Sequence, residues 1–242
     1  MPAVQPLRAI RALAALSRDP DDTAQVFTII DALSGDTPER NLRRFAAHPD
    51  GARLLRERPE IVPVLSDQDA LRALPAGSLG RAYLAFVQGE SITADGLVEA
   101  AEDGSLDIRE QGSDLDWLAR RIRDTHDLWH NVTGFRGDVL GEASLLAFSH
   151  AQLPNAGVLL IVMTALARLH DVAATKLILG AMRTGASAEW LPVVDWESML
   201  HLPLDEVRAR LRITPAPDYA PLRTRELRAQ GMLPARGLAR AA

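Results

Sequence analysis

The chain has 242 residues, of which 47% are hydrophobic and 24% charged, and its formal net charge is −5. This length and composition suit a soluble globular protein with a sizeable core, and the acidic balance argues against general binding of nucleic acid. The sequence contains no cysteine. Disulfides, thiolate ligands and cysteine nucleophiles are therefore excluded, and any metal site must use nitrogen and oxygen ligands.

The first ninety residues carry the start and stop signals of several short helices. Leucine and isoleucine recur at helical spacing from residue 7 to residue 16, and caps or helix-starting prolines predict further helices near residues 24, 37 and 50. The stretch 74–83 predicts a tight turn into another helix, and Thr93 would cap the next one. Because no long run alternates apolar and polar residues, the fold class is predicted to be all-α, with Val193-Val194 as the one weak strand candidate.

A longer helix is predicted at about residues 114–132, because a capping box precedes it and Gly134 supplies a stop. This helix carries His126, Asp127 and His130. At 3.6 residues per turn, His130 lies about 40° round the helix from His126, and Asp127 lies about 100° from His126. Three potential metal ligands would thus share one face.

A chain reversal is predicted after this helix, since two glycines are followed by Asp138, which can cap a new helix. Glu142 would lie in the first turn of that helix. Two imidazoles and two carboxylates suit zinc, while two imidazoles and one carboxylate with open positions also suit iron(II). The predicted metal ligands are His126, Asp127, His130 and Glu142, and the identity of the metal is left open.

A purely structural alternative also fits these residues. Arg123 precedes Asp127 by four residues and could pair with it on a solvated helix face, with His126 an ordinary border residue. Histidines at i and i+4 are a known ligand spacing. The glycine-rich turn that would bring a glutamate back to them is a second feature expected of a metal site. Together these features favour the metal site.

The second half of the chain contains its most apolar helices, predicted at 143–152 and at about 156–182. The uncharged run 157–167 is too short to span a bilayer, and a helix that is apolar on most sides must be surrounded by other helices or line a cavity. We expect an apolar groove or tunnel beside the metal site. The predicted lipid-binding residues are Leu145, Phe148, Leu159, Val162, Ala165 and Leu166. The alternative is a close-packed core in which small residues merely let helices approach.

The domain organisation is predicted to be one helical domain at 1–213 and a basic C-terminal extension at 214–242 that contains proline and glycine. From Val207 onward there are eight arginines against two acidic residues, and residues 1–18 carry three arginines and no acid. Both ends of the chain could approach an anionic membrane, although arginine-rich termini are more often solvated tails. For the first helix, docking on the domain is favoured over membrane contact, because its apolar stripe lacks the bulky aromatic residues of interfacial anchors. The extension is expected to be extended or loosely ordered, with packing through Tyr219, Leu222 and Leu227.

The motif residues together resemble the coenzyme Q (ubiquinone) biosynthesis protein 4 family, whose members carry His-Asp-x-x-His-x11-Glu. Here that motif is intact and consists of His126, Asp127, His130 and Glu142. The resemblance covers nearly the whole chain. It extends to residues 77–83, to Arg123-Asp124-Thr125, to 145–148, to Asp195-Trp196-Glu197 and to Pro203-Leu204.

The resemblance implies an all-helical protein that supports ubiquinone formation and works with other ubiquinone biosynthesis proteins at a membrane surface. It also implies a divalent metal on the four motif residues, usually zinc, with iron(II) or manganese(II) as alternatives. Eukaryotic members carry a mitochondrial targeting segment, whereas the helical domain here begins within a few residues of Met1. We therefore expect a cytoplasmic protein at the inner face of the plasma membrane. A homodimer is left open.

The sequence and the resemblance are compatible with two main functions. The first is an enzyme, with the metal and a prenylated precursor brought together for oxidative decarboxylation at C1 of the 4-hydroxybenzoate-derived ring. The second is a non-enzymatic, lipid-binding organiser of the biosynthetic complex in which the metal is structural. A third and weaker alternative is a metalloprotease, because His-Asp-x-x-His is similar to the zincin motif.

Overall fold

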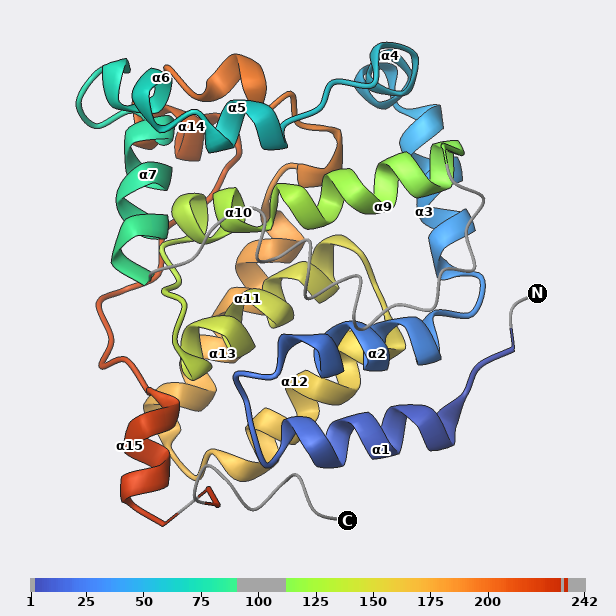
Figure 1. Ribbon diagram of the computed structural model, residues 1–242, viewed down its shortest axis with the longest axis vertical. Coiled ribbons are helices and arrows are strands. Elements are labelled where there is room, and N and C mark those ends of the chain that lie inside the picture. The colour runs from blue at the N-terminus through green and yellow to red at the C-terminus, as the bar shows by residue number, and fades with distance from the viewer. Residues whose placement is uncertain (1–2, 91–111, 232, 235–242) are drawn as a thin grey trace.

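The computed structural model describes residues 3–90, 112–231 and 233–234, and the regular structure within them is helical apart from one isolated β-bridge between Ser78 and Pro203 (Figure 1). The prediction of an all-α fold is confirmed, and the strand candidate Val193 lies in a short 3-10 helix. The helix predicted after Thr93 lies outside the described residues. The elements are α1 Pro6–Leu16, α2 Thr23–Ser34, α3 Thr37–Ala47, α4 Pro49–Glu57, α5 Val62–Ser66, α6 Gln68–Ala73, α7 Leu79–Glu90, α9 Asp114–Asp124, α10 His126–Thr133, α11 Val139–Gln152, α12 Ala156–Arg168, α13 Val172–Ser187, η1 Leu191–Val193, η2 Glu197–Met199, α14 Leu204–Arg210 and α15 Thr224–Ala229.

The longest helices form one half of the molecule, which lies in the lower part of Figure 1. There α11 packs along α13, α12 packs on α11 and α2, and α1 pairs with α2. Phe148 of α11 and Ile178 of α13 are fully buried in the main core at this contact. Burial of such side chains contributes roughly 1.5–3 kcal/mol each, which makes the α11–α13 pair a firm base for the turn that precedes α11.

The other half contains α7, α10 and α14, which contact one another, and α9, which packs against α3 (Figure 1). The stretch 77–80 pairs with the backbone at 200–204: the amides of Leu79 and Gly80 donate to the carbonyls of Leu202 and Leu200, at 2.9 and 2.8 Å. Two of the stretches that carry the family resemblance are therefore neighbours that hold the start of α7 in place.

The buried Arg121 of α9 ties this half to η2. Its guanidinium donates to both carboxylate oxygens of Glu197 at 2.8 Å and to the carbonyl of Val194 at 3.2 Å. This bidentate geometry pairs a charge that is only 4% exposed with an opposite charge. A structural tie between α9 and η2 thus accounts for Glu197 in the Asp195-Trp196-Glu197 motif.

Two helix boundaries differ from the prediction. The helix expected at 114–132 is broken at Thr125, whose hydroxyl donates to the carbonyl of Arg121 at 2.9 Å and so competes with the helical backbone. The helix expected at 156–182 is also broken, since α12 ends at Arg168 and the Asp171 carboxylate caps α13 by accepting from the amide of Ala174 at 2.6 Å.

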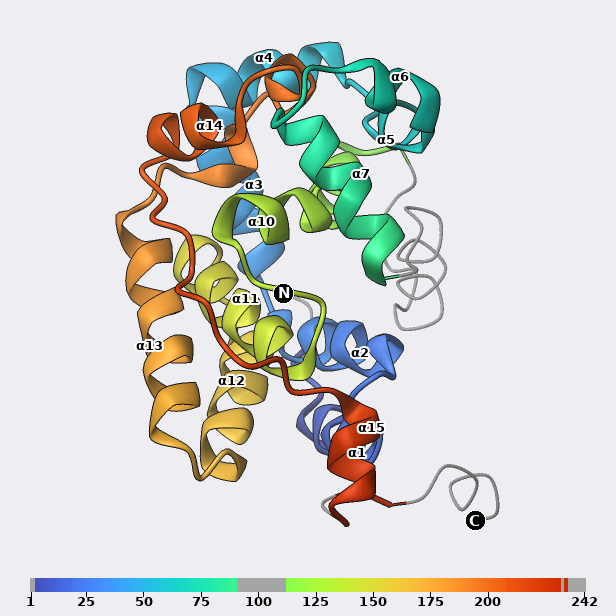
Figure 2. The same ribbon diagram turned by 90° about the vertical axis from the view of Figure 1, so that its left-hand side faces the viewer.

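Residues 214–229, which we call the C-terminal strap, follow α14, cross α11 and end with α15 (Figure 2). The strap packs on the helical body: the amide of Ala216 donates to the carbonyl of Thr133 at 2.7 Å, and the carbonyl of Leu222 accepts from the amide of Val139 at 3.0 Å. At its far end, Arg228 pairs with Asp19 at 2.6 Å. Leu227 is buried, as the sequence suggested.

The first helix docks on the body through Ala9 and Ala12, which are buried against α2, while Leu7 and Ile10 on its outer side are 71% and 58% exposed. None of the described helices combines the length and the apolarity that crossing a bilayer would require.

Candidate metal centre

Both histidines of the motif project from α10 on successive turns. Their ring centroids are 4.8 Å apart and the ring planes meet at 76°. The helix ends at Gly134, which has a left-handed φ of 76° and whose amide donates to the carbonyl of His130 at 2.8 Å. Glycine is the residue best suited to this conformation, and it turns the chain back toward the histidines.

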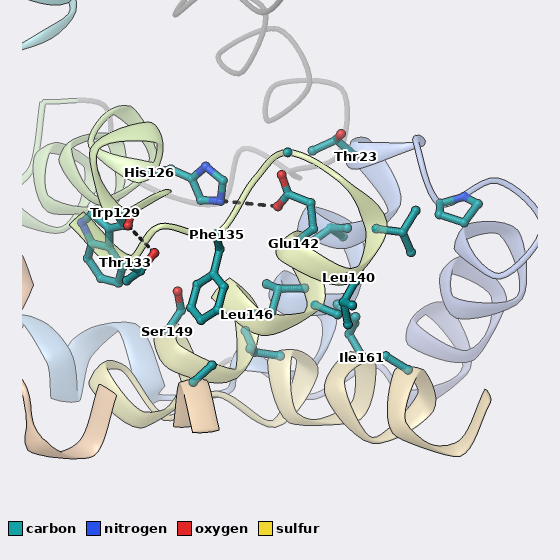
Figure 3. Close-up of a pocket in the computed structure, with 18 of the residues that line it drawn as sticks. Thr23, His126, Trp129, Thr133, Phe135, Leu140, Glu142, Leu146, Ser149 and Ile161 are labelled. Carbon is teal, nitrogen blue, oxygen red and sulfur yellow. Dashed lines mark hydrogen bonds and ion pairs between the residues drawn. The ribbon is translucent and has the colours of Figure 1, made fainter. Parts of the chain in front are cut away.

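Glu142 returns to the histidines from the first turn of α11, as predicted. Asp138 caps that helix, because its Oδ1 atom accepts from the amides of Leu140 and Gly141 at 3.1 and 3.4 Å. Glu142 Oε1 lies 3.2 Å from His130 Nε2, and Glu142 Oε2 lies 3.9 Å from His126 Nε2. Figure 3 shows the side chains of His126 and Glu142 pointing toward each other. One ligand atom from each of His126, His130 and Glu142 lies within 4.8 Å of the others.

The second nitrogen of each ring is occupied by an acceptor. His130 Nδ1 lies 3.0 Å from the carbonyl oxygen of Phe135, and His126 Nδ1 lies 3.2 Å from Asp127 Oδ1. Because these oxygens can only accept, each Nδ1 carries a proton, and Nε2 is the nitrogen of each ring that faces Glu142. Histidines that bind metals are usually held in this way.

Asp127, predicted as a fourth ligand, lies outside this group of three. Its side chain is 8% exposed and contacts the Nδ1 side of His126, whereas Glu142 faces Nε2. The alternative pairing of Asp127 with Arg123 is not seen either, since Arg123 Nε donates to Asp124 at 2.7 Å. Asp127 therefore orients the imidazole of His126 in this arrangement.

The charges of the site are strongly coupled. Burial lowers the pKa of His130, but the nearby carboxylate of Glu142 raises it more, so that its pKa lies above the ordinary value. Partial removal of Glu142 from bulk water raises its pKa, and the positive charge of His130 outweighs this effect, so that the pKa of Glu142 is lowered. A divalent cation bound here would take the place of the proton that His130 shares with Glu142.

Two neighbours of the site were not predicted from the sequence. The ring of Phe86 from α7 stacks on His130, with centroids 5.0 Å apart and planes at 22°. The carbonyl of Phe135 fixes the orientation of the same imidazole. Phe86 lies far from His130 in the chain. Every residue has a backbone carbonyl, so the residue type at position 135 does not reveal the contact. Neither contact could have been found from helical periodicity.

The site opens on a cavity of about 2790 Å³, whose walls come from α1 to α3, α9 to α13, the C-terminal strap and neighbouring loops. His126, Asp127 and Glu142 line it together with apolar side chains such as Leu146 and Ile161 (Figure 3). The Glu142 side chain is 43% exposed, whereas that of His130 is 1% exposed. The candidate ligands thus present one accessible side toward a largely apolar space.

The six residues predicted to bind lipid fall into different environments. Ala165 lines the cavity. Leu145, Phe148 and Val162 are 0–1% exposed and belong to the main core, so they border no open space. Leu159 is 37% exposed on the outer side of α12. Leu166 is partly buried against the core.

The sequence of the chain matches one known protein family. The sequence profile described as "Coenzyme Q (ubiquinone) biosynthesis protein Coq4" matches residues 5–217. The mitochondrial ubiquinone biosynthesis protein coq4 of Talaromyces stipitatus is 34% identical over 178 residues, which are 72% of this chain and 60% of that protein. The protein of the same name from Schizosaccharomyces japonicus is 31% identical over 190 residues, with 75% of each chain covered.

The chain therefore spans about 60% of the length of the Talaromyces relative. A crystal structure of a protein assigned to ubiquinone biosynthesis in Nostoc punctiforme superposes with a TM-score of 0.64 at 24% identity, covering 85% of this chain and 94% of that one. This likeness supports the all-helical fold. With the profile matched over most of its length, this chain belongs to the coenzyme Q (ubiquinone) biosynthesis protein Coq4 family.

Proposed function

We propose that this protein acts in ubiquinone biosynthesis by binding a prenylated quinone precursor with its aromatic head beside a divalent metal. The metal would be held by His126, His130 and Glu142. The observation that carries this proposal is that the three candidate ligands lie in, or directly behind, the wall of a large and mostly apolar cavity.

The donor set fits such a metal. Two imidazole Nε2 atoms and one carboxylate suit Zn²⁺ once a metal has displaced the Nε2 protons, and Fe²⁺ or Mn²⁺ would accept the same ligands. Three protein ligands leave a coordination position for a substrate oxygen. A bound cation would stabilise negative charge on the carboxylate or phenolate of the ring. Asp127 and Phe135 hold the two imidazoles in the required orientation through their Nδ1 atoms.

The cavity is large enough for an extended lipid tail. Its volume of about 2790 Å³ exceeds the roughly 300–1,000 Å³ of ordinary small-molecule pockets. Burial of each methylene contributes about 0.8 kcal/mol, so a few isoprene units would bind firmly. Leu146, Val158, Ile161 and Ala165 are among the cavity residues that such a tail would contact.

Within this proposal we favour oxidative decarboxylation at C1 of the prenylated 4-hydroxybenzoate-derived ring, in which CO2 leaves, a hydroxyl group from water takes its place, and dioxygen accepts the two electrons and two protons. The accessible side of Glu142 is the observation in its favour. The second candidate is a non-enzymatic organiser with a structural metal, and it is favoured by the way the three ligands bridge α10 and α11 across one turn. A protease fits less well, because Asp127 contacts His126 and is not available as a general base.

We further propose that the protein docks on an anionic membrane surface through the outer side of α1. Leu7 and Ile10 are exposed there beside Arg11, so that apolar side chains and a positive charge share a surface that could contact anionic lipids. Substitution of both apolar residues, Leu7→Glu with Ile10→Glu, should reduce co-sedimentation with phosphatidylglycerol vesicles several-fold. The exposed Val64→Glu on α5, which lies at the other end of the molecule (Figure 1), serves as the control. Equal binding by both variants would contradict this docking surface.

The metal site is tested by its ligands. His130→Ala and Glu142→Ala should each lower bound metal from near one equivalent per chain to below about a tenth, because a first ligand is lost. Arg123→Ala should keep its metal, since Arg123 pairs with Asp124 outside the group of three. Elemental analysis of the purified, folded variants measures the difference. Stoichiometric metal in both ligand variants would rule out the proposed site.

The cavity is tested by filling it. Ala165→Trp places an indole in the wall, so it should displace an isoprenoid that copurifies with the wild-type protein and abolish saturable binding of a prenylated hydroxybenzoate. Leu159→Trp on the outer side of the same helix is the matched control and should bind as the wild type does. Native mass spectrometry and solvent extraction report the bound lipid. A wild-type protein that neither carries nor binds an isoprenoid would contradict the proposal.

A further inference from the structure

Tyr219 of the C-terminal strap lies over the turn that joins α10 to α11. Its hydroxyl oxygen accepts from the backbone amide of Arg136 at 2.8 Å, and its hydroxyl hydrogen is donated to Asp138 Oδ2 at 2.9 Å. The side chain of Arg136 lies over the tyrosine ring at 5.2 Å from its centroid. The phenol thus bonds to both ends of the segment that carries the chain from the turn into α11.

Asp138 is the residue through which this contact reaches the candidate metal centre. It is 4% exposed, its Oδ1 caps α11 and also accepts from the amide of Leu222 at 2.8 Å, and its Oδ2 accepts from Tyr219. Its carbonyl accepts from the amide of Glu142 at 2.8 Å. Without the phenol, one oxygen of a buried carboxylate would lose this donor, and the cap could rotate.

The fit between the strap and the first turn of α11 is close. A Cβ atom at Gly141 would lie 2.6 Å from the Tyr219 hydroxyl and 2.0 Å from the carbonyl oxygen of Arg136, so only glycine allows both contacts. Burial raises the pKa of Tyr219, and the charge of Asp138 raises it further, so the phenol stays protonated and remains a donor.

We propose that Tyr219 is a positioning residue for the metal centre: by fixing Asp138, it holds the first turn of α11 so that the Glu142 carboxylate faces Nε2 of His126 and His130. The inference rests on the proposed metal site. It assigns the C-terminal strap a role in metal affinity, although the strap contributes no ligand.

The test is a titration of the full-length, metal-free protein with Co²⁺, whose visible spectrum reports the ligand geometry, followed by competition with Zn²⁺. Tyr219→Phe removes only the hydroxyl and should weaken metal affinity about tenfold or more and alter the Co²⁺ spectrum. Arg228→Gln loosens the far end of the strap at Asp19 without touching Asp138. It should keep both the affinity and the spectrum of the wild type.

The outcomes separate a failure of the positioning role of Tyr219 from a failure of the proposed metal site. If wild type and Glu142→Ala bind metal equally or not at all, the proposed metal site is wrong, and the positioning role of Tyr219 is wrong as well. If Glu142→Ala loses metal while Tyr219→Phe binds as the wild type does, the positioning role alone is wrong. Equal losses in Tyr219→Phe and Arg228→Gln would indicate general loosening of the strap and would also overturn it. Should Tyr219→Phe fail to fold, Asp138→Asn replaces one carboxylate oxygen by an amide that cannot accept from the phenol, and it is expected to show the same loss.

Discussion

The contact between His130 and Glu142 across the α10–α11 turn is the interaction on which the rest of the site depends. A buried imidazole and a carboxylate 3.2 Å apart are each costly to leave unpaired, and each shifts the pKa of the other toward the charged form. The stacked ring of Phe86 and the carbonyl of Phe135 hold the imidazole in place. The carboxylate is held by the cap at Asp138. Such a prearranged pair needs little rearrangement to accept a cation.

Local signals in the sequence were sufficient for the core of this site. The i, i+4 spacing places His126 and His130 on one side of a helix, and the glycines and Asp138 predict the turn that returns Glu142 to them. The position of the Asp127 side chain could not be predicted in this way. Angular position on an ideal helix does not reveal that its carboxylate contacts the Nδ1 side of His126. Nor does it reveal the break at Thr125, which depends on a side-chain hydrogen bond.

The cavity was harder to predict because its walls come from elements that are distant in the chain. Helical periodicity correctly marked α11 and α12 as apolar, but a buried leucine in a close-packed core and a leucine facing a cavity have the same sequence pattern. Thus Phe148 and Val162 belong to the packed core while Ala165 lines the cavity. The contacts of the motif at 77–80 and of Glu197 hold the fold together. They tie α7 and α9 to the segments that precede α14.

The most direct test of the central claim is a crystal structure of the zinc-loaded protein with anomalous diffraction measured at the zinc absorption edge. The proposed site requires one anomalous peak per chain, about 2.0–2.2 Å from Nε2 of His126, Nε2 of His130 and a carboxylate oxygen of Glu142, with a remaining position open to the cavity. A peak elsewhere in the molecule would contradict this site. So would a zinc ion closed off by Asp127 as a fourth protein ligand, because no position would then be left for a substrate oxygen.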